Sequence, residues 1–215
     1  MIKACLFDLD GVIVDTAKYH YIAWKELAAE LGFEFTEKDN ERLKGVSRMA
    51  SLDILLSIGG ITKTEKEKDL LAQRKNERYV SLISQMEADE ILPGAKEFLT
   101  ACRKTGIATA LGSASKNATI ILERLKLNDL FDVIIDGTHT TKAKPDPEVF
   151  LLGAAALRVE PEHCVVFEDA EAGIEAALAA GMKCVGIGSS EVLGKANLVI
   201  AGLHQMSLEK LKDLQ

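Results

Sequence analysis

The chain has 215 residues, of which 47% are apolar and 27% charged, as in globular proteins with one sizeable domain or a domain with an insertion. Its formal net charge of −7 disfavours a nucleic-acid partner, whose phosphates would be repelled over much of the surface. No apolar run approaches the length of a membrane span. From the charge and the apolar pattern together, we expect neither nucleic acid nor a membrane as a partner.

The N-terminal residues and the cysteines indicate a cellular compartment. Met1-Ile2-Lys3 leads directly into a strand and lacks the basic start, apolar centre and cleavage site of a signal peptide. The four cysteines show no metal-ligand spacing and lie in apolar or helical patterns. Both features favour a cytoplasmic protein with buried, free thiols.

The first predicted strand, residues 2–7, ends in carboxylates. The stretch "CLFDLDGVIVD" places Asp8 and Asp10 where the apolar run meets a turn at Gly11, and Asp15 follows closely. Because Asp8 and Asp10 are two residues apart, an extended chain directs both side chains to one side. These two carboxylates are therefore candidates for a shared site.

The interval after Asp15 is helical in pattern. Residues 16–31 and 48–58 form two predicted helices, and the capping-box patterns Thr36-x-x-Asp39 and Thr64-x-x-Glu67 begin two more. The sequence "LPG" at residues 92–94 marks the return to strands. We therefore predict a four-helix cap domain, residues 16–90, inserted into a core domain of residues 1–15 and 91–215.

The core domain alternates strands and helices. Further strands are predicted at residues 107–111, 133–135, 164–167, 184–187 and 198–200. Between and after them lie helical patterns at residues 94–105, 116–125, 147–157, 170–180 and 208–214. Several of the strands are continuously apolar, which is typical of strands covered on both faces. The fold class is therefore α/β, with a doubly wound, parallel, Rossmann-like sheet.

Polar residues follow the ends of these strands, where open α/β sheets bind their ligands. They are Asp8, Asp10, Ser113, Ser115, Lys116, Asn117, Lys144, Glu168 and Asp169. Carboxylates of this kind bind Mg²⁺, and a carboxylate can attack phosphorus to form an aspartyl-phosphate. A lysine and a hydroxyl would stabilise the charge on the transferring group. The set indicates Mg²⁺-dependent phosphoryl transfer.

Some of these residues, and the nearby Asp15, also have a purely structural interpretation. Asp169 and Asp15 could be helix N-caps, Ser113 a turn residue and Lys144 a solvated lysine. Their joint occurrence, in this order along a doubly wound pattern, favours a functional site.

The four strand-end motifs, "DLDGV", a serine, "KP" and "ED", resemble those of the haloacid dehalogenase superfamily in order. The resemblance implies that Asp8 is the nucleophile and Asp10 the general acid/base, while Ser113 and Lys144 hold the phosphoryl group. It also implies Mg²⁺ ligation by the Asp8 carboxylate, the Asp10 carbonyl and Asp169, with Glu168 close by. The helical insertion resembles the four-helix cap of that superfamily.

Within the insertion, "TAKYHYIAWKELAAELG" and "LKGVSR" resemble the β-phosphoglucomutase branch, as does "SASKN" on the core. This resemblance implies that Arg48 binds the phosphate that is not reacting and that His20 lies near Asp10. The implied substrate-binding residues are His20, Trp24, Lys44, Gly45, Val46, Ser47, Arg48, Lys75, Ser115, Lys116 and Asn117. Val14, Asp15 and Thr16 would form a hinge. From periodicity alone, His20 and Trp24 fit a core stripe better, and Arg48 could be solvated.

Three functions remain open on these grounds. The first is a monomeric enzyme that interconverts β-glucose 1-phosphate and glucose 6-phosphate through an aspartyl-phosphate and a sugar bisphosphate. The second is a sugar-phosphate phosphatase, which needs one phosphate site where a mutase needs two. The third is a phosphosugar-binding regulator, against which the intact Asp8, Asp10, Lys144 and Asp169 argue.

Overall fold

The computed structural model describes residues 1–43 and 46–214 and divides into two compact units. One unit comprises Met1–Asp15 and Glu87–Gln215, and the other comprises Thr16–Met86. The chain therefore re-enters the sheet-containing unit at Glu87, before the predicted boundary at residue 91. The re-entering segment contacts the loop after the first strand, since Ile91 pairs with Val14 and the Leu92 N–H donates to the Ile13 carbonyl.

Within the described residues, six parallel strands form a single sheet in the order β3-β2-β1-β4-β5-β6. They are β1 (Ala4–Phe7), β2 (Ala108–Gly112), β3 (Val133–Ile135), β4 (Cys164–Glu168), β5 (Lys183–Ile187) and β6 (Leu198–Ile200). The chain runs outward from β1 to β3 and then continues on the other side of β1 with β4. The ends of β1, β2 and β4 are thus adjacent at the point where the winding reverses. The predicted α/β fold class is confirmed.

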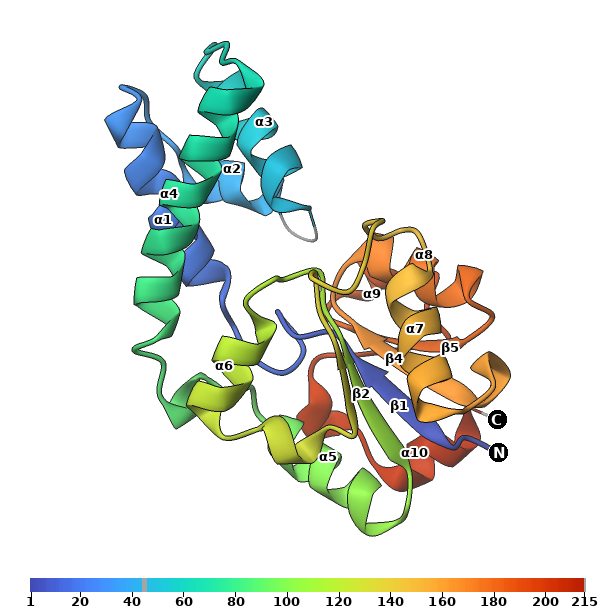
Figure 1. Ribbon diagram of the computed structural model, residues 1–215. Coiled ribbons are helices and arrows are strands. Elements are labelled where there is room, and N and C mark those ends of the chain that lie inside the picture. Colours follow the sequence, from blue (N-terminus) through green and yellow to red (C-terminus); the bar gives the residue numbers. More distant parts are fainter. Residues whose placement is uncertain (44–45, 215) are drawn as a thin grey trace. The chain divides into compact units, whose positions relative to one another are not determined.

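Helices cover both faces of this sheet (Figure 1). The α-helices of this unit are α5 (Ala95–Lys104), α6 (Ala118–Leu125), α7 (Glu148–Leu157), α8 (Glu171–Ala179), α9 (Ser190–Leu193) and α10 (Leu208–Asp213). Short 3-10 helices occur at η1 (Ala88–Glu90), η2 (Asn128–Leu130), η3 (Pro161–His163) and η4 (Leu203–Gln205). Helix α9 was not predicted from the sequence, because its single turn is too short to show a helical period.

The alternation of side chains along β1 divides the core into two layers. Leu6 packs in a cluster that includes Phe150 of α7 and Ile174 of α8. On the opposite face, Phe7 stacks on Phe167 with ring centroids 4.8 Å apart and meets Phe98 of α5 edge-on. Since both faces of β1 are covered by apolar layers, the strand itself carries only apolar side chains. The first polar side chain after it is that of Asp8.

The cysteines lie within these layers, as expected. Cys5, Cys102, Cys164 and Cys184 are all buried and free. Among the described residues, no helix combines the length and the apolar character needed to span a membrane.

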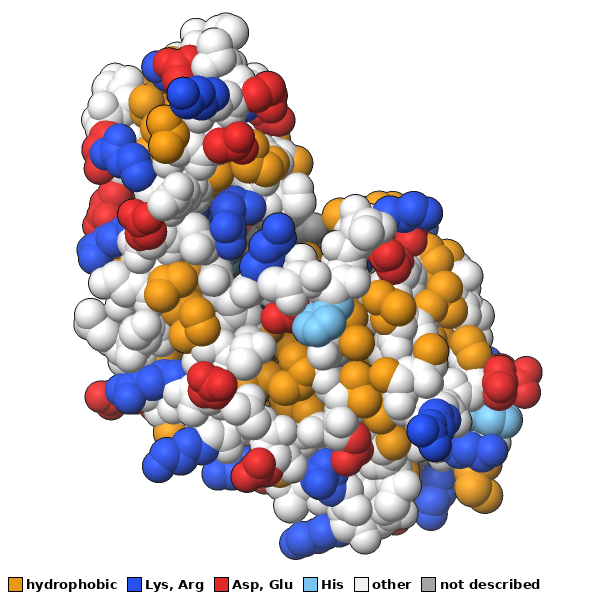
Figure 2. Space-filling model, viewed as in Figure 1, with side chains coloured by type: hydrophobic (Ala, Val, Ile, Leu, Met, Phe, Trp, Pro, Cys, Tyr) orange, Lys and Arg blue, Asp and Glu red, His pale blue; other side chains and the backbone are white. Residues whose placement is uncertain are grey.

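The second unit consists of α1 (Ala17–Glu30), α2 (Glu37–Glu41), α3 (Arg48–Ile58) and α4 (Glu65–Ile83). Both predicted capping boxes are present, at Thr36 and Thr64. The apolar core of this unit includes Phe35, Leu52 and Leu55. On the visible face of this unit, acidic and basic side chains lie next to one another (Figure 2). Within the unit, Arg78 Nε lies 2.6 Å from Glu26 Oε2.

Candidate active site

Lys144 links the ends of three strands at the carboxyl edge of the sheet. Its Nζ donates to Asp8 Oδ1 at 2.6 Å, to Glu168 Oε1 at 2.5 Å and to the Gly112 carbonyl at 3.1 Å. The Lys144 side chain is only 4% exposed, so the solvated alternative for this residue is wrong. The structure thus brings Lys144 together with three residues that are far from it in the sequence.

A group of three carboxylates surrounds this contact. Oxygen atoms of Asp8, Glu168 and Asp169 lie within 4.8 Å of one another. Oxygen donors from several carboxylates suit a hard divalent cation. The group therefore forms a candidate metal site, in which Asp8 and Asp169 were predicted as ligands and Glu168 as a residue close to the ion.

Two glycines make room for these carboxylates. Gly11 has φ of +77°, and a Cβ there would lie 2.1 Å from Asp169 Oδ2. A Cβ on Gly173, in α8, would lie 2.0 Å from Glu168 Oε1. The role of Gly11 in the turn was predicted, whereas that of Gly173 was missed. A glycine inside a helical pattern, which costs about 1 kcal/mol relative to alanine, was the available signal.

The electrostatics of the cluster are dominated by negative charge. Burial raises the pKa of Asp8 well above its ordinary value; Lys144 opposes this shift, and the carboxylates of Glu168, Asp10 and Asp169 add to it. Burial alone would lower the pKa of Lys144, but Asp8 and Glu168 raise it. The lysine therefore stays charged. The carboxylates together carry more negative charge than this one lysine neutralises, and a divalent cation would offset the excess.

The loop after β1 is held in a tight turn. The Asp8 N–H donates to the Phe167 carbonyl, which extends the β1–β4 ladder, and the Gly11 N–H donates to the Val14 carbonyl at 2.7 Å. Asp10 forms a bridge with Val14 and lies close enough to Asp8 to raise its pKa. This places Asp10 next to the predicted nucleophile, while its acid/base role stays a prediction.

Backbone turns organise the loop after β2. Ser113 is buried; its hydroxyl accepts the Ser115 N–H at 3.1 Å, and the Ser115 hydroxyl accepts the Asn117 N–H at 3.2 Å. Asn117 is also buried, whereas Lys116 is exposed. The turn and the phosphate-binding interpretations of Ser113 are thus compatible, because the hydroxyl that accepts a backbone N–H keeps its own proton.

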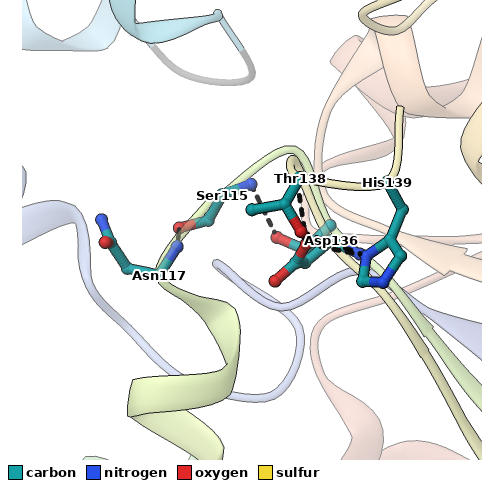
Figure 3. Close-up of polar contacts among 6 residues, drawn as sticks. Ser115, Asn117, Asp136, Thr138 and His139 are labelled. Atoms are coloured by element: carbon teal, nitrogen blue, oxygen red, sulfur yellow. Dashed lines mark hydrogen bonds and ion pairs between the residues drawn. The ribbon is translucent and has the colours of Figure 1, made fainter. Parts of the chain in front are cut away.

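A carboxylate that was not predicted from the sequence as a site residue follows β3. Asp136 is 3% exposed, and Figure 3 shows Thr138 and His139 directed at it. Its Oδ1 accepts the Thr138 N–H at 2.8 Å and contacts His139 Nδ1 at 2.9 Å. These contacts lower the pKa of Asp136 although burial opposes them. The next residue, Gly137, donates its N–H to the Ser115 carbonyl, so Asp136 shapes the turn that braces the Ser113–Asn117 loop.

The second unit carries a separate cluster around Lys75. Lys75 Nζ lies 2.7 Å from His20 Nδ1, and the same ammonium lies 4.5 Å from the centre of the Trp24 ring and 4.7 Å from that of Tyr79. The His20 ring stacks on Tyr79. Burial, with Lys75 and Arg48 adding to it, lowers the pKa of His20 well below its ordinary value. His20 is therefore neutral at pH 7 and can accept a hydrogen bond from Lys75.

Trp24 fits the core alternative, since it is 2% exposed within the apolar cluster of this unit. The substrate contacts predicted for His20, Trp24 and Lys75 are not tested by this arrangement and stay predictions.

Arg48 begins α3. Ser47 is the N-cap residue, and its side chain accepts the Ala50 N–H at 3.4 Å. Arg48 is half-buried, and burial lowers its pKa, so it is not the fully solvated residue of the alternative interpretation. Val46 precedes the cap, while Lys44 and Gly45 lie outside the described residues.

The helix-cap alternatives are wrong for two of the carboxylates. The N-cap residue of α8 is Ala170 rather than Asp169, and that of α1 is Thr16 rather than Asp15. Asp15 is exposed, while Val14 and Thr16 are buried. Their role as a hinge stays a prediction.

Known proteins share both the sequence and the fold. A model of the haloacid dehalogenase-like hydrolase family matches residues 2–181. A β-phosphoglucomutase of Bacillus subtilis (strain 168) is 46% identical over 98% of this chain and 94% of its own length. A phosphorylated carbohydrates phosphatase of Thermotoga maritima is 34% identical over 99% of this chain and 97% of its own.

Among solved structures, a β-phosphoglucomutase from Clostridium difficile is 45% identical. The match has a TM-score of 0.94 and covers 100% of this chain and 97% of the other. Together with the clustered strand-end carboxylates and Lys144, these similarities show that the chain belongs to the haloacid dehalogenase-like hydrolase family and, within it, to the β-phosphoglucomutase branch.

Proposed function

We propose that this protein is a β-phosphoglucomutase, an isomerase that interconverts β-D-glucose 1-phosphate and D-glucose 6-phosphate. The observation that carries the proposal is the cluster of Asp8, Lys144, Glu168 and Asp169 at the sheet edge, in a chain 46% identical to the β-phosphoglucomutase of Bacillus subtilis. Such a cluster suits phosphoryl transfer, in which catalysis is mostly positioning and electrostatic stabilisation.

The residues present fit Mg²⁺ as the cofactor. Carboxylate oxygens of Asp8, Glu168 and Asp169 lie within 4.8 Å of one another. Lys144, which bonds to Asp8 and Glu168, offsets part of their negative charge. The Asp8 and Asp169 carboxylates and the Asp10 carbonyl would hold the ion, with Glu168 close by. When bound, Mg²⁺ supplies positive charge that offsets the negative charge of the carboxylates and of the phosphoryl oxygens.

In the proposed cycle, Asp8 receives the phosphoryl group. A carboxylate oxygen of Asp8 bonds to phosphorus as the bond from phosphorus to the ester oxygen breaks, and Asp10 donates a proton to that leaving oxygen. Ser113 and Lys144 hold the transferring group. In the reverse direction, Asp10 takes the proton of the incoming sugar hydroxyl while that oxygen bonds to phosphorus and releases the Asp8 carboxylate.

A mutase uses these two half-reactions in sequence. Phosphorylated Asp8 transfers its group to the 6-hydroxyl of β-glucose 1-phosphate, which gives the 1,6-bisphosphate. After the bisphosphate binds in the opposite orientation, Asp8 takes the 1-phosphoryl group and glucose 6-phosphate is released. A second phosphate-binding group is therefore needed for the phosphate that is not reacting.

Arg48 is the proposed second phosphate ligand. It lies at the first position of α3, where free backbone N–H groups and a guanidinium can bind phosphate together. Ser47, Val46, Lys44 and Gly45 belong to the same segment, and His20 and Lys75 supply further polar groups on the same unit. Flexing at Val14, Asp15 and Thr16 would allow closure that excludes water from the aspartyl-phosphate.

The second candidate is a Mg²⁺-dependent sugar-phosphate phosphatase. It is favoured by the 34% identity to the phosphorylated carbohydrates phosphatase of Thermotoga maritima, and it would use the same Asp8 chemistry with water as acceptor. We expect either enzyme to act in the cytoplasm as a monomer on a small phosphosugar, without nucleic-acid or membrane partners.

In the deciding experiment, purified protein is incubated with Mg²⁺ and β-glucose 1-phosphate, with and without the 1,6-bisphosphate. The formation of glucose 6-phosphate and the release of free phosphate are measured separately. Formation of glucose 6-phosphate that the bisphosphate accelerates is expected of the mutase. Free phosphate without isomerisation would identify the phosphatase. Excess chelator should stop either reaction, and full activity in its presence would contradict the Mg²⁺ assignment.

A further inference from the structure

The position of Lys144 depends on an irregular loop between β3 and α7, residues 136–147. The tip of the Lys144 side chain is held by Asp8, Glu168 and the Gly112 carbonyl. Its backbone, however, belongs to neither a strand nor a helix. The ammonium can lie within bonding distance of the Asp8 carboxylate only if this loop is itself held in one conformation.

Glu148, the first residue of α7, bonds back to this loop. Its Oε2 accepts the N–H groups of Thr141 at 2.8 Å and Lys142 at 2.7 Å, and its Oε1 accepts the Thr141 hydroxyl at 3.0 Å. Bonds from backbone N–H groups to an ionised carboxylate are short and strong. They lower the pKa of Glu148, so this residue is charged at neutral pH.

The same helix end also holds the other side of the loop. The Glu148 N–H donates to Asp146 Oδ1 at 3.0 Å, and the Asp146 N–H donates to the Ala143 carbonyl. Residues 142–148 therefore form a short closed segment with Lys144 inside it. Lys142 lies two positions before Lys144, a separation that spans at most about 7 Å of extended chain.

We propose that Glu148 is a positioning residue for Lys144. Its carboxylate holds the backbone just before Lys144, and this fixes where the lysine side chain begins and hence where its ammonium meets Asp8. This inference rests on the proposed role of Lys144 in phosphoryl transfer. The glutamate contacts the loop backbone and the Thr141 hydroxyl, so its effect on the reaction passes through Lys144.

A different explanation of Glu148 can be separated from this one. An acidic residue in the first turn of a helix interacts favourably with the helix dipole, whatever it bonds to. That effect requires the charge, whereas the anchoring of the loop requires an acceptor oxygen. Glu148→Gln removes the charge but keeps an oxygen that can accept both N–H groups, and Glu148→Ala removes both.

The kinetic test uses the full chain with Mg²⁺ and acetyl phosphate, and measures release of inorganic phosphate. For Glu148→Ala we expect kcat/KM to fall about 10- to 100-fold, the usual range for loss of an orienting partner or a small misplacement. Glu148→Gln should restore most of the activity. Glu97→Ala is the matched control, since it removes an exposed first-turn carboxylate from α5 of the same unit, and it should match the wild type.

Amide hydrogen exchange on the same proteins, without substrate, tests the anchoring directly. Peptides that contain residues 141–144 should exchange faster in Glu148→Ala than in the wild type, Glu148→Gln or Glu97→Ala. Unchanged exchange in Glu148→Ala, unchanged kcat/KM in that variant, or an equal loss in Glu148→Gln would overturn the proposal. Neither measurement uses a glucose phosphate, so failure of the wild type to isomerise glucose 1-phosphate would count against the proposed function alone.

Discussion

Asp8 lies in a site where charge is crowded. It is 8% exposed, bonds to Lys144 at 2.6 Å, and shares the sheet edge with Glu168 and Asp169. Burial and the neighbouring carboxylates raise its pKa, so ionised Asp8 destabilises the folded state. Such a residue is expected to contribute more to the reaction than to stability.

Asp8→Asn tests this expectation. The amide keeps an oxygen that can accept from Lys144 but cannot act as the nucleophile, so turnover of β-glucose 1-phosphate should be abolished. Because one negative charge leaves a crowded cluster, the melting temperature should equal or exceed that of the wild type. Thermal unfolding and a coupled assay of glucose 6-phosphate give the two results. Sustained turnover, with deamidation back to Asp excluded by mass spectrometry, would rule out Asp8 as the nucleophile.

At the scale of elements, α8 shows a conflict between helix propensity and the site. Gly173 lies inside the helix, where alanine would ordinarily be more stable by about 1 kcal/mol. A Cβ there would lie 2.0 Å from Glu168 Oε1, and Glu168 is only 1% exposed. The glycine therefore leaves room for a buried carboxylate at the expense of helix stability.

Gly173→Ala should consequently reverse the usual sign. We expect a lower melting temperature and a higher Mg²⁺ concentration for half-maximal activity, because the methyl group displaces Glu168 from Lys144 and from the other carboxylates. Calorimetry and a Mg²⁺ titration of the rate measure both effects. Ala172→Gly, at the preceding position of the same helix, is the control for propensity alone. A Gly173→Ala variant more stable than the wild type, with an unchanged Mg²⁺ requirement, would contradict this account.

The start of α4 gives a pH-dependent prediction. The backbone N–H and hydroxyl of Thr64, with Lys63, lower the pKa of Glu67 from 4.5 to about 2. A carboxyl group with a lowered pKa stabilises the folded state fully above its unfolded value and loses that contribution as pH falls. The capping contribution of Glu67 should therefore disappear between about pH 4.5 and pH 2.

Thr64→Ala should raise the pKa of Glu67 toward 4.5, because the hydroxyl that donates to its Oε2 at 2.8 Å is gone. The variant should also cost about 1 kcal/mol of unfolding free energy, as loss of an N-cap side chain typically does. Carboxyl NMR titration measures the shift. The pKa of Asp39 in the capping box of α2 should stay low in the same variant and serves as the control. An unchanged Glu67 pKa would show that Lys63 and the backbone suffice.

At the scale of the whole molecule, the two units carry different parts of the proposed chemistry. The sheet unit contains the carboxylates and Lys144, which in this proposal act on the transferring phosphoryl group. The helical unit contains Arg48, His20 and Lys75, a cationic and polar group that a hydrolysis of small acyl phosphates would not require. Under this proposal, the distinction between mutase and phosphatase depends on the helical unit.

Arg48→Ala separates the two activities. A contact between a guanidinium and a phosphate contributes about 1.5–3 kcal/mol, or about 10- to 150-fold in binding. Mutase turnover should fall by at least that factor, whereas hydrolysis of acetyl phosphate, which has no distal phosphate, should change little. Both rates are measured on one preparation. A parallel loss of the two would mean that Arg48 supports the fold or the common chemistry, and no loss in either would remove the main physical support for a mutase.

The sequence by itself determined the order of elements, the insertion of a helical module after the first strand and the identity of the strand-end residues. These follow from local information: continuous apolar runs, capping boxes and carboxylates beside a glycine turn, each of which acts over a few residues. Helix α3 begins and ends at the predicted residues, and all six strands lie where the apolar runs predict them in the described chain.

Only the tertiary structure decided which of those residues meet and which others support them. The bonds from Lys144 to Asp8 and Glu168 join segments 136 and 24 residues apart, and no local pattern specifies such distances. The same is true of Gly173, Asp136 and Glu148, whose roles arise from close approach, burial and backbone contacts. Chemistry-bearing side chains can be read from their types and order, whereas the residues that position them are defined by packing, which the whole chain determines together.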